Sequence, residues 1–349
     1  MDTVHERPIR REEHSPEICV KQVTSARVFV HHDGALGDVL LSLPCLQRIR
    51  VSSGFLHLAC RTDIGELLQH AGLADEISRV DSLLYSQLYA DLPGGWSCGT
   101  LSSFDRAYLF IARATRFADN LKQCIPDVRV IRTIPPADAP ERATLFRLRQ
   151  CGDDEFADSV PLSLPEADRV WAERLLAGQG FKEGRDRLLI VHPGSGGVKK
   201  CWPLKNYLDL IRSLSGYPQI WCVVLSGPAE PRETISDLQE LASNDPHVVH
   251  LHQEPLSRVA ALLNIADYYL GNDSGISHLA GAMHCQGTVL FGPTDPQVWR
   301  PFCEGIEAIQ FTQEGEREPV TALRLRELIL SALRSNRQKY VDWNTGRIR

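Results

Sequence analysis

The chain has no apolar run long enough to cross a bilayer. Its longest apolar stretches, such as Leu188–Val191 and Ile220–Leu225, are far shorter than the roughly 20 residues that a membrane-spanning helix needs. Residues 1–24 are rich in charge and lack the apolar segment of a secretory signal. We therefore expect a cytoplasmic protein that begins with a flexible N-terminal extension over residues 1–24.

Sequence patterns for metal, redox and nucleic-acid sites are also missing. The ten cysteines include no C-x-x-C pair, and the chain contains no D-x-D motif that could hold a divalent ion across a diphosphate. We expect reduced thiols, no bound metal and no cofactor. The net charge of −6 does not suit a nucleic-acid partner, because phosphate backbones select a basic surface.

What the 349 residues do contain is a repeated alternation of short β-branched runs and segments of helical period. This alternation predicts parallel sheets covered by helices on both faces, and the length predicts two domains. The alternation of strand and helix patterns is interrupted between Pro135 and Pro165. We expect an N-terminal Rossmann-like domain over residues 25–170, a C-terminal one over 171–335, and a polar tail over 336–349.

A glycine-rich loop follows the predicted strand Leu188–Val191. Gly194, Ser195 and Gly196 let main-chain N–H groups approach an anion, and Lys200 supplies a cation close by. This chemistry suits a diphosphate. A plain surface turn with neighbouring lysines is the alternative for this loop alone.

A second loop, Gly271–His278, has the same arrangement of strand end, polar residues and helix. The unpaired N–H groups of a helix start attract phosphate, so we assign Asp273, Ser274, Gly275 and His278 to donor binding. Capping of the helix by Asp273 or Ser274 is the simpler alternative. His278 is either a ligand contact or a structural histidine.

Two carboxylates follow other predicted strands. Glu230 comes after Ile220–Leu225, where it could accept the hydroxyl groups of a ribose. Asp38 comes after strand Arg27–His31, as a general base or as a helix N-cap. The glycines near Asp38 lack the G-x-G-x-x-G spacing, so NAD is a weak interpretation.

Four motifs occur in order along the chain: Leu36–Asp38, His192–Pro203, Asn272–Ala280 and Phe291–Pro296. Together they resemble the heptosyltransferase family, glycosyltransferase family 9. The resemblance implies the GT-B fold, two Rossmann-like doubly wound domains facing each other across a cleft. It also implies that Asp38 is the base, that Lys200 binds the diphosphate, and that Gly37 and His32 lie on the acceptor side.

The resemblance implies an inverting glycosyltransferase that moves a heptose from a nucleotide-sugar donor, ADP-heptose, to the lipopolysaccharide core. That acceptor is an anionic lipid-linked glycan, which suits an excess of basic residues between 101 and 150 and peripheral contact with the inner face of the cytoplasmic membrane. His32 replaces the arginine of many members, and Lys199 sits beside Lys200.

Two other functions fit the same pattern. A non-hydrolysing sugar-nucleotide epimerase shares the two-domain plan but needs no separate acceptor. A nucleotide-sugar-binding protein without catalysis is the non-enzymatic alternative, and Asp38 and Lys200 argue against it.

Overall fold

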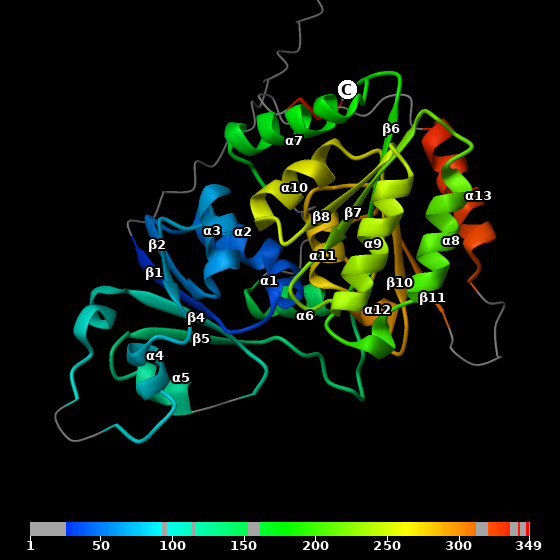
Figure 1. The fold of residues 1–349 in the computed structure, drawn as a ribbon. Coiled ribbons are helices and arrows are strands. Elements are labelled where there is room, and N and C mark those ends of the chain that lie inside the picture. Colours follow the sequence, from blue (N-terminus) through cyan, green and yellow to red (C-terminus); the bar gives the residue numbers. More distant parts are fainter. Residues whose placement is uncertain are drawn as a thin grey trace, which may run out of the picture.

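The computed structural model describes residues 26–92, 96–113, 116–152, 161–311, 320–335, 341–342 and 347–348. These residues form two α/β units that lie side by side, each built on a parallel sheet (Figure 1). The extension predicted for residues 1–24 lies outside the described residues. In the predicted polar tail, β12 (Val341–Asp342) and β13 (Arg347–Ile348) form a short antiparallel pair.

The N-terminal sheet has five parallel strands in the order β3-β2-β1-β4-β5. The strands are β1 (Arg27–His32), β2 (Phe55–Cys60), β3 (Glu76–Arg79), β4 (Arg106–Ile111) and β5 (Asp127–Arg132). Side chains of β1 alternate between the two faces, since Val28 and Val30 pack in one apolar cluster and Phe29 in another. Both faces are therefore covered.

Helices cover the two faces of this sheet in two groups. One group packs with Val28 and Val30, and the other packs with Phe29. The first group contains α1 (Leu36–Leu41), α2 (Leu43–Val51), α3 (Thr62–His70) and α6 (Ala143–Gln150), and the second contains α4 (Leu83–Gln87), the 3₁₀ turn η1 (Gly99–Ser103) and α5 (Arg116–Leu121).

The C-terminal sheet has six parallel strands in the order β11-β10-β9-β6-β7-β8. They are β6 (Arg187–His192), β7 (Ile220–Ser226), β8 (Val248–His252), β9 (Tyr268–Asn272), β10 (Gly287–Phe291) and β11 (Ile306–Gln310). Because β6 and β9 are neighbours while β7 and β8 lie beyond β6, the order reverses beside β6. Doubly wound proteins bind ligands at such a point.

Helices again lie on both faces. One side has α7 (Glu166–Gln179), α10 (Leu256–Ile265) and α11 (Gly275–Ala282), and the other has α8 (Leu204–Leu214), α9 (Arg232–Asn244) and α13 (Ala322–Ser335). Two short elements, η2 (Val198–Lys200) and α12 (Pro296–Trp299), lie in loops at the carboxyl ends of β6 and β10. No helix in the described ranges has both the length and the apolar character needed to span a bilayer.

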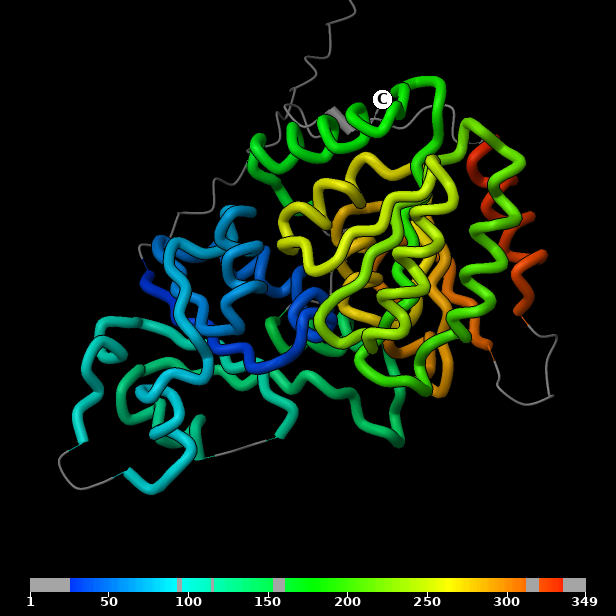
Figure 2. The backbone as a smooth tube through the Cα atoms, in the orientation of Figure 1, coloured from blue at the N-terminus to red at the C-terminus, as the bar shows by residue number. Residues whose placement is uncertain are grey.

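The two units share one apolar cluster. It runs from Val30 and Leu46 of the N-terminal unit to Leu262 and Leu279 of the C-terminal unit. Figure 2 shows the chain passing between the units and α7 lying along the C-terminal one. The domain boundary expected between residues 170 and 171 falls inside α7, which packs against α10, and that boundary stays a prediction.

Candidate functional site

The carboxyl ends of three neighbouring strands, β9, β6 and β7, bring the predicted donor loops together. Asn272, fully buried at the end of β9, joins two of them. Its Nδ2 donates to the Pro193 carbonyl at 2.6 Å, and its Oδ1 accepts hydrogen bonds from the Trp202 N–H and the Tyr207 hydroxyl, each at 2.9 Å. A buried amide with both ends bonded fixes the loop after β6 against the loop after β9.

Lys200 and Asp273 form the charged centre of this edge. The Lys200 Nζ lies 2.8 Å from the Asp273 Oδ2, and the Thr294 hydroxyl donates to the same oxygen at 2.6 Å. The Ser195 hydroxyl donates to the Asp273 carbonyl at 2.6 Å. The Asp273 side chain is 6% exposed, whereas that of Lys200 is 38% exposed. The lysine side chain is therefore partly exposed beside a buried carboxylate.

Ser274 is the N-cap of α11, and its hydroxyl accepts a hydrogen bond from the Ser277 N–H. The capping alternative is therefore right for Ser274. It is wrong for Asp273, whose carboxylate is bonded to Lys200 and Thr294 instead. The start of α11 faces the Lys200 loop, since Ser274 is also bonded to His192 of β6 at 3.2 Å.

Glu230 turns back toward the glycine-rich loop. Its carboxylate accepts a hydrogen bond from the Gly227 N–H at 2.6 Å and lies 3.6 Å from the His192 Nε2. A Cβ on Gly194 would fall 1.6 Å from the Glu230 Oε1. Glycine at residue 194 is therefore what allows the carboxylate to sit over the loop. Gly196 is exposed and has open space where a Cβ would stand.

Helices α1 and α11 bring the two units into direct contact. A Cβ on Gly37 would lie 2.9 Å from the His278 Cδ2, and a Cβ on Gly275 would lie 2.9 Å from the Leu36 Cβ. His278 is 8% exposed. Burial lowers the pKa of His278 to about 4, partly opposed by the carboxylates of Asp273 and Asp38. The imidazole is therefore neutral at pH 7, between carboxylates from both units.

Asp38 does not cap α1. The N-cap residue is Ala35, without a side-chain cap bond, and Asp38 lies in the first turn with its side chain 42% exposed. Its Oδ1 lies 3.3 Å from a guanidinium nitrogen of Arg147, whose side chain is fully buried. One carboxylate oxygen of Asp38 is therefore paired, and the side chain remains open to solvent.

His32, predicted on the acceptor side, has no exposed surface. Its Nδ1 accepts from the Gly34 N–H at 3.2 Å, so in the neutral ring Nε2 donates to the Ser42 hydroxyl at 3.1 Å. Burial, with Arg147 nearby, holds the pKa of His32 well below its usual range. The ring also stacks on Phe110. This placement favours support of α1 over contact with an acceptor, while Gly37 lies at the contact with His278.

Four residues of this centre were not assigned from the sequence: Asn272, Thr294, His192 and Arg147. Asn272, Thr294 and His192 lie within the motifs identified in the sequence, at strand ends or just after them. Their position at the carboxyl ends of strands could have marked them as site residues. Arg147 lies within the basic stretch and carries no local signal, because its partners Asp38 and Ser42 are more than 100 residues away.

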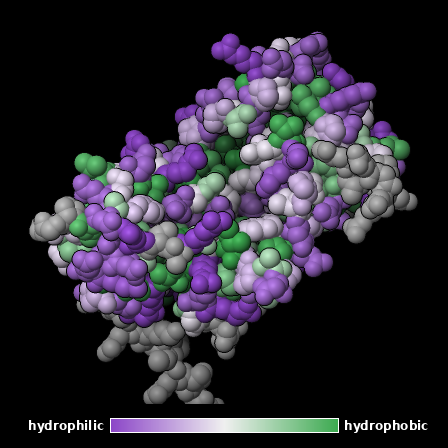
Figure 3. Space-filling model, turned by 90° about the horizontal axis from the view of Figure 1, so that it is seen from below, coloured by the Kyte–Doolittle hydropathy of each residue, from purple (hydrophilic) through white to green (hydrophobic). Residues whose placement is uncertain are grey.

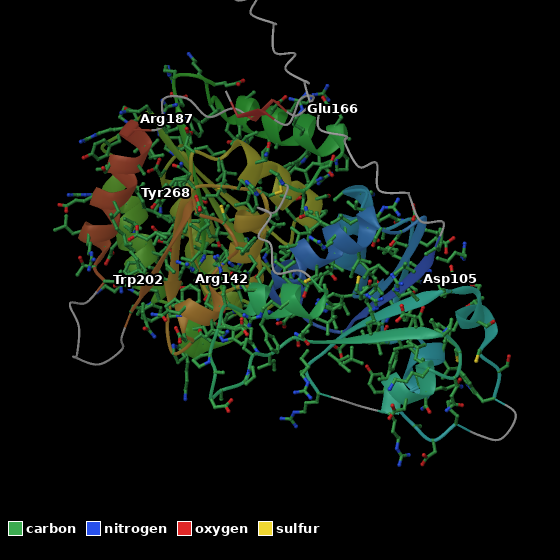
Figure 4. The ribbon with its side chains drawn as sticks, turned by 180° about the vertical axis from the view of Figure 1, so that it is seen from behind. Asp105, Arg142, Glu166, Arg187, Trp202 and Tyr268 are labelled. Carbon is green, nitrogen blue, oxygen red and sulfur yellow. The ribbon has the colours of Figure 1, made fainter. Side chains whose placement is uncertain are left out.

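The basic excess between residues 101 and 150 is largely neutralised. Carboxylates pair with six of its nine members: Arg106, Arg116, Lys122, Arg129, Arg147 and Arg149. The guanidinium of Arg142 binds the Pro301 carbonyl (Figure 4). Figure 3 shows one face of the molecule, on which hydrophobic residues are scattered among hydrophilic ones. The nine described cysteines are free thiols.

Residues 155–324 match the family model described as glycosyltransferase family 9 (heptosyltransferase). Over 182 residues the chain is 25% identical to lipopolysaccharide heptosyltransferase 3 of Escherichia coli, a match that covers 51% of each chain. The chain thus spans about half the length of the curated relatives it matches.

Two solved structures have the same fold over most of this chain. A glycosyl transferase family 9 protein from Veillonella parvula has a TM-score of 0.70 at 16% identity, covering 90% of this chain and 99% of its own. The ADP-heptose lps heptosyltransferase II of E. coli has a TM-score of 0.67 at 16% identity, with 88% and 99% covered. The predicted GT-B fold is confirmed by these matches and by the two parallel sheets. The predicted resemblance to glycosyltransferase family 9, the heptosyltransferase family, is confirmed over residues 155–324, where the chain matches the model of that family.

Proposed function

We propose that this chain is an inverting glycosyltransferase that moves a heptose or a related sugar from a nucleoside diphosphate to the lipopolysaccharide core. The observation that carries the proposal is the contact of α1 with α11, where His278 interacts both with Asp38 of one unit and with the Lys200–Asp273 pair of the other. ADP-heptose is the proposed donor, because one relative of the same fold is named an ADP-heptose heptosyltransferase.

The reaction is a single displacement. Asp38 takes the proton from an acceptor hydroxyl while that oxygen forms a bond to the anomeric carbon, and the bond from that carbon to the diphosphate oxygen breaks. The new glycosidic bond lies on the opposite face of the sugar. The 42% exposure of the Asp38 side chain leaves its carboxylate accessible to an acceptor.

The C-terminal unit holds the donor and stabilises the leaving group. Three kinds of group lie at the ends of β6 and β9. They are the Lys200 ammonium, the main-chain N–H groups at Gly194, Ser195 and Gly196, and the start of α11 at Ser274 and Gly275. Such donors, fixed before the reaction, stabilise charge that develops on the diphosphate. Glu230 accepts hydrogen bonds from the ribose hydroxyls, and the neutral imidazole of His278 donates one hydrogen bond.

The proposed donor binding uses the side chains and main-chain N–H groups of this edge and no metal ion. In the ranges the structure describes, no three His, Cys, Asp or Glu side chains converge to hold an ion. The acceptor is an anionic lipid-linked glycan that binds the N-terminal unit, with peripheral contact at the cytoplasmic membrane. Since most of the basic stretch is paired, we expect that contact to be weak and to weaken further with salt.

A thermal-shift panel of ADP-, UDP-, GDP- and CDP-sugars tests the donor. A ligand at 100 times its Kd stabilises a protein by about 2.7 kcal/mol, so ADP-heptose should raise the Tm and the other bases should not. Incubation with the donor and a lipopolysaccharide core that lacks heptose should yield a glycosidic bond whose anomeric configuration is opposite to that of the donor. Retention of configuration would contradict the proposed displacement, and a new epimer from donor alone would indicate the epimerase.

A further inference from the structure

Arg147 is a charged side chain with no exposed surface, and it lies close to the proposed base. Its Nε and NH2 donate to the Thr133 carbonyl, just after β5, at 3.0 and 2.8 Å. NH1 donates to the Asp38 carbonyl and, at 2.9 Å, to the Ser42 hydroxyl. NH2 also reaches the Asp38 Oδ1 at 3.3 Å. All three nitrogens are therefore used.

The polar groups beneath α1 form one consistent network. Ser42 accepts from Arg147 and from the His32 Nε2, and its own proton goes to the Asp38 carbonyl at 3.2 Å. A buried guanidinium needs a counter-charge, and the Asp38 carboxylate supplies it. The arginine thus holds the backbone and one carboxylate oxygen of the same residue.

The helix that carries Arg147 also touches the C-terminal unit. Arg142, the N-cap residue of α6, donates to the Pro301 carbonyl at 2.5 Å, and its guanidinium stands 4.8 Å from the centre of the Phe302 ring. Ala143 packs with Val298 of α12. Figure 4 shows Arg142 where α6 meets the C-terminal unit. One short helix therefore contacts both the donor-side unit and the Asp38 carboxylate.

We propose that Arg147 is a positioning residue: from α6 it fixes the orientation of the Asp38 carboxylate, so that Oδ1 is held and Oδ2 is left for the acceptor hydroxyl. The inference rests on the proposed function, because it needs Asp38 as the base. A lysine has one ammonium and cannot make the forked contacts with Thr133, Ser42 and Asp38 together. Misplacement of a reacting group by about 1 Å costs on the order of 10² in rate.

The test compares Arg147→Lys with Arg149→Lys on the same helix, because Arg149 pairs with Glu141 at the surface. We expect Arg147→Lys to lower kcat by about 10²-fold, with the donor KM within about twofold and an unchanged thermal shift by ADP. Arg149→Lys should behave as wild type. If Arg147→Lys retains kcat within about threefold, the inference is overturned.

Two further measurements separate positioning from general stability. In the Asp38→Asn background, Arg147→Lys should lower the residual rate by less than about threefold, because the group it positions is gone. An equal loss in both backgrounds would overturn the inference. Ser42→Ala, which removes a smaller group of the network, should lower kcat in the same direction but less.

A third measurement needs no turnover. Urea unfolding of Arg147→Met, Asp38→Asn and the double variant should give non-additive changes in the free energy of unfolding. If the wild-type chain transfers no sugar, the proposed function fails, and this cycle still decides whether Arg147 and Asp38 are coupled. Additive changes would overturn the inference on either outcome.

Discussion

The two edges that meet at α1 and α11 are built in different ways. On the C-terminal side, the contacts join the ends of the neighbouring strands β6 and β9 and the loops that follow them, through His192, Lys200, Asp273 and Ser274. On the N-terminal side, Asp38 is paired with Arg147, 109 residues further along the chain. The proposed donor edge is thus built from the ends of adjacent strands and their loops, whereas the proposed acceptor edge includes a side chain from helix α6.

The largest expected effect tests the N-terminal side of this comparison. Asp38→Asn removes the proposed base while keeping its size, so we expect kcat to fall by about 10²–10⁴-fold with ADP binding unchanged. Asp63→Asn is the matched control, since Asp63 is an exposed acid in the first turn of α3. Steady-state transfer and calorimetric ADP titration provide the two readouts. Transfer within tenfold of wild type would exclude Asp38 as the base.

The second effect tests the donor edge. Lys200→Ala removes the ammonium next to the buried Asp273 carboxylate, and we expect kcat to fall by about 10²–10³-fold. Lys199→Ala is the control, because the exposed Lys199 adjoins Lys200 in η2. Transfer assays with both variants also decide which lysine acts. Near-normal turnover of Lys200→Ala would remove it from the proposed mechanism.

A smaller effect is expected where the edges touch. A Cβ on Gly37 would press on the His278 ring at 2.9 Å, so Gly37→Ala should separate α1 from α11 by a few tenths of an ångström. We expect kcat/KM to fall about tenfold, in the range that sub-ångström misplacement produces, with little change in Tm. Gly216→Ala is the control, since it has open space around its Cβ position. Equal kinetics in the two variants would show that this contact does not matter for transfer.

The same difference explains what the sequence predicted. The predicted strands Arg27–His31, Leu188–Val191 and Ile220–Leu225 lie within one residue of the bounds of β1, β6 and β7, because short apolar runs are local patterns. The donor loops followed from their position after those strands. The lysine–aspartate pair could not be read from the sequence, because it depends on how the loops after β6 and β9 fold together.

The N-terminal site was less predictable. Asp38 was found through its motif, but its environment was not, because α6 and the end of β5 reach it through the tertiary fold. His32 was placed on the acceptor side, although alternation along β1 directs it to the covered face with Val28 and Val30. The sequence of a strand indicates which of its side chains share a face. It does not indicate which residues from elsewhere in the chain pack on that face.

The last prediction concerns acid stability, to which both units contribute. Burial lowers the pKa of His31, His192 and His278 to about 4, whereas an unfolded histidine titrates near 6.5. Below about pH 6.5 these histidines bind protons in the unfolded chain but not in the folded one. The free energy of unfolding should therefore fall as the pH drops toward 4. Each histidine contributes up to about 3 kcal/mol, at 1.36 kcal/mol per pKa unit.

His31→Phe removes the contribution of one N-terminal histidine to that loss. The His31 ring lies 4.3 Å from the Phe117 ring, and neither of its nitrogens has a hydrogen-bond partner in the described part of the chain. A phenyl ring fits among these aromatic neighbours and cannot be protonated. We therefore expect urea unfolding between pH 6.5 and 4 to show a shallower loss of stability for His31→Phe than for wild type. His70→Gln, at an exposed site, should keep the wild-type slope. Equal slopes for all three proteins would mean that His31 is protonated as readily in the folded chain as in the unfolded one.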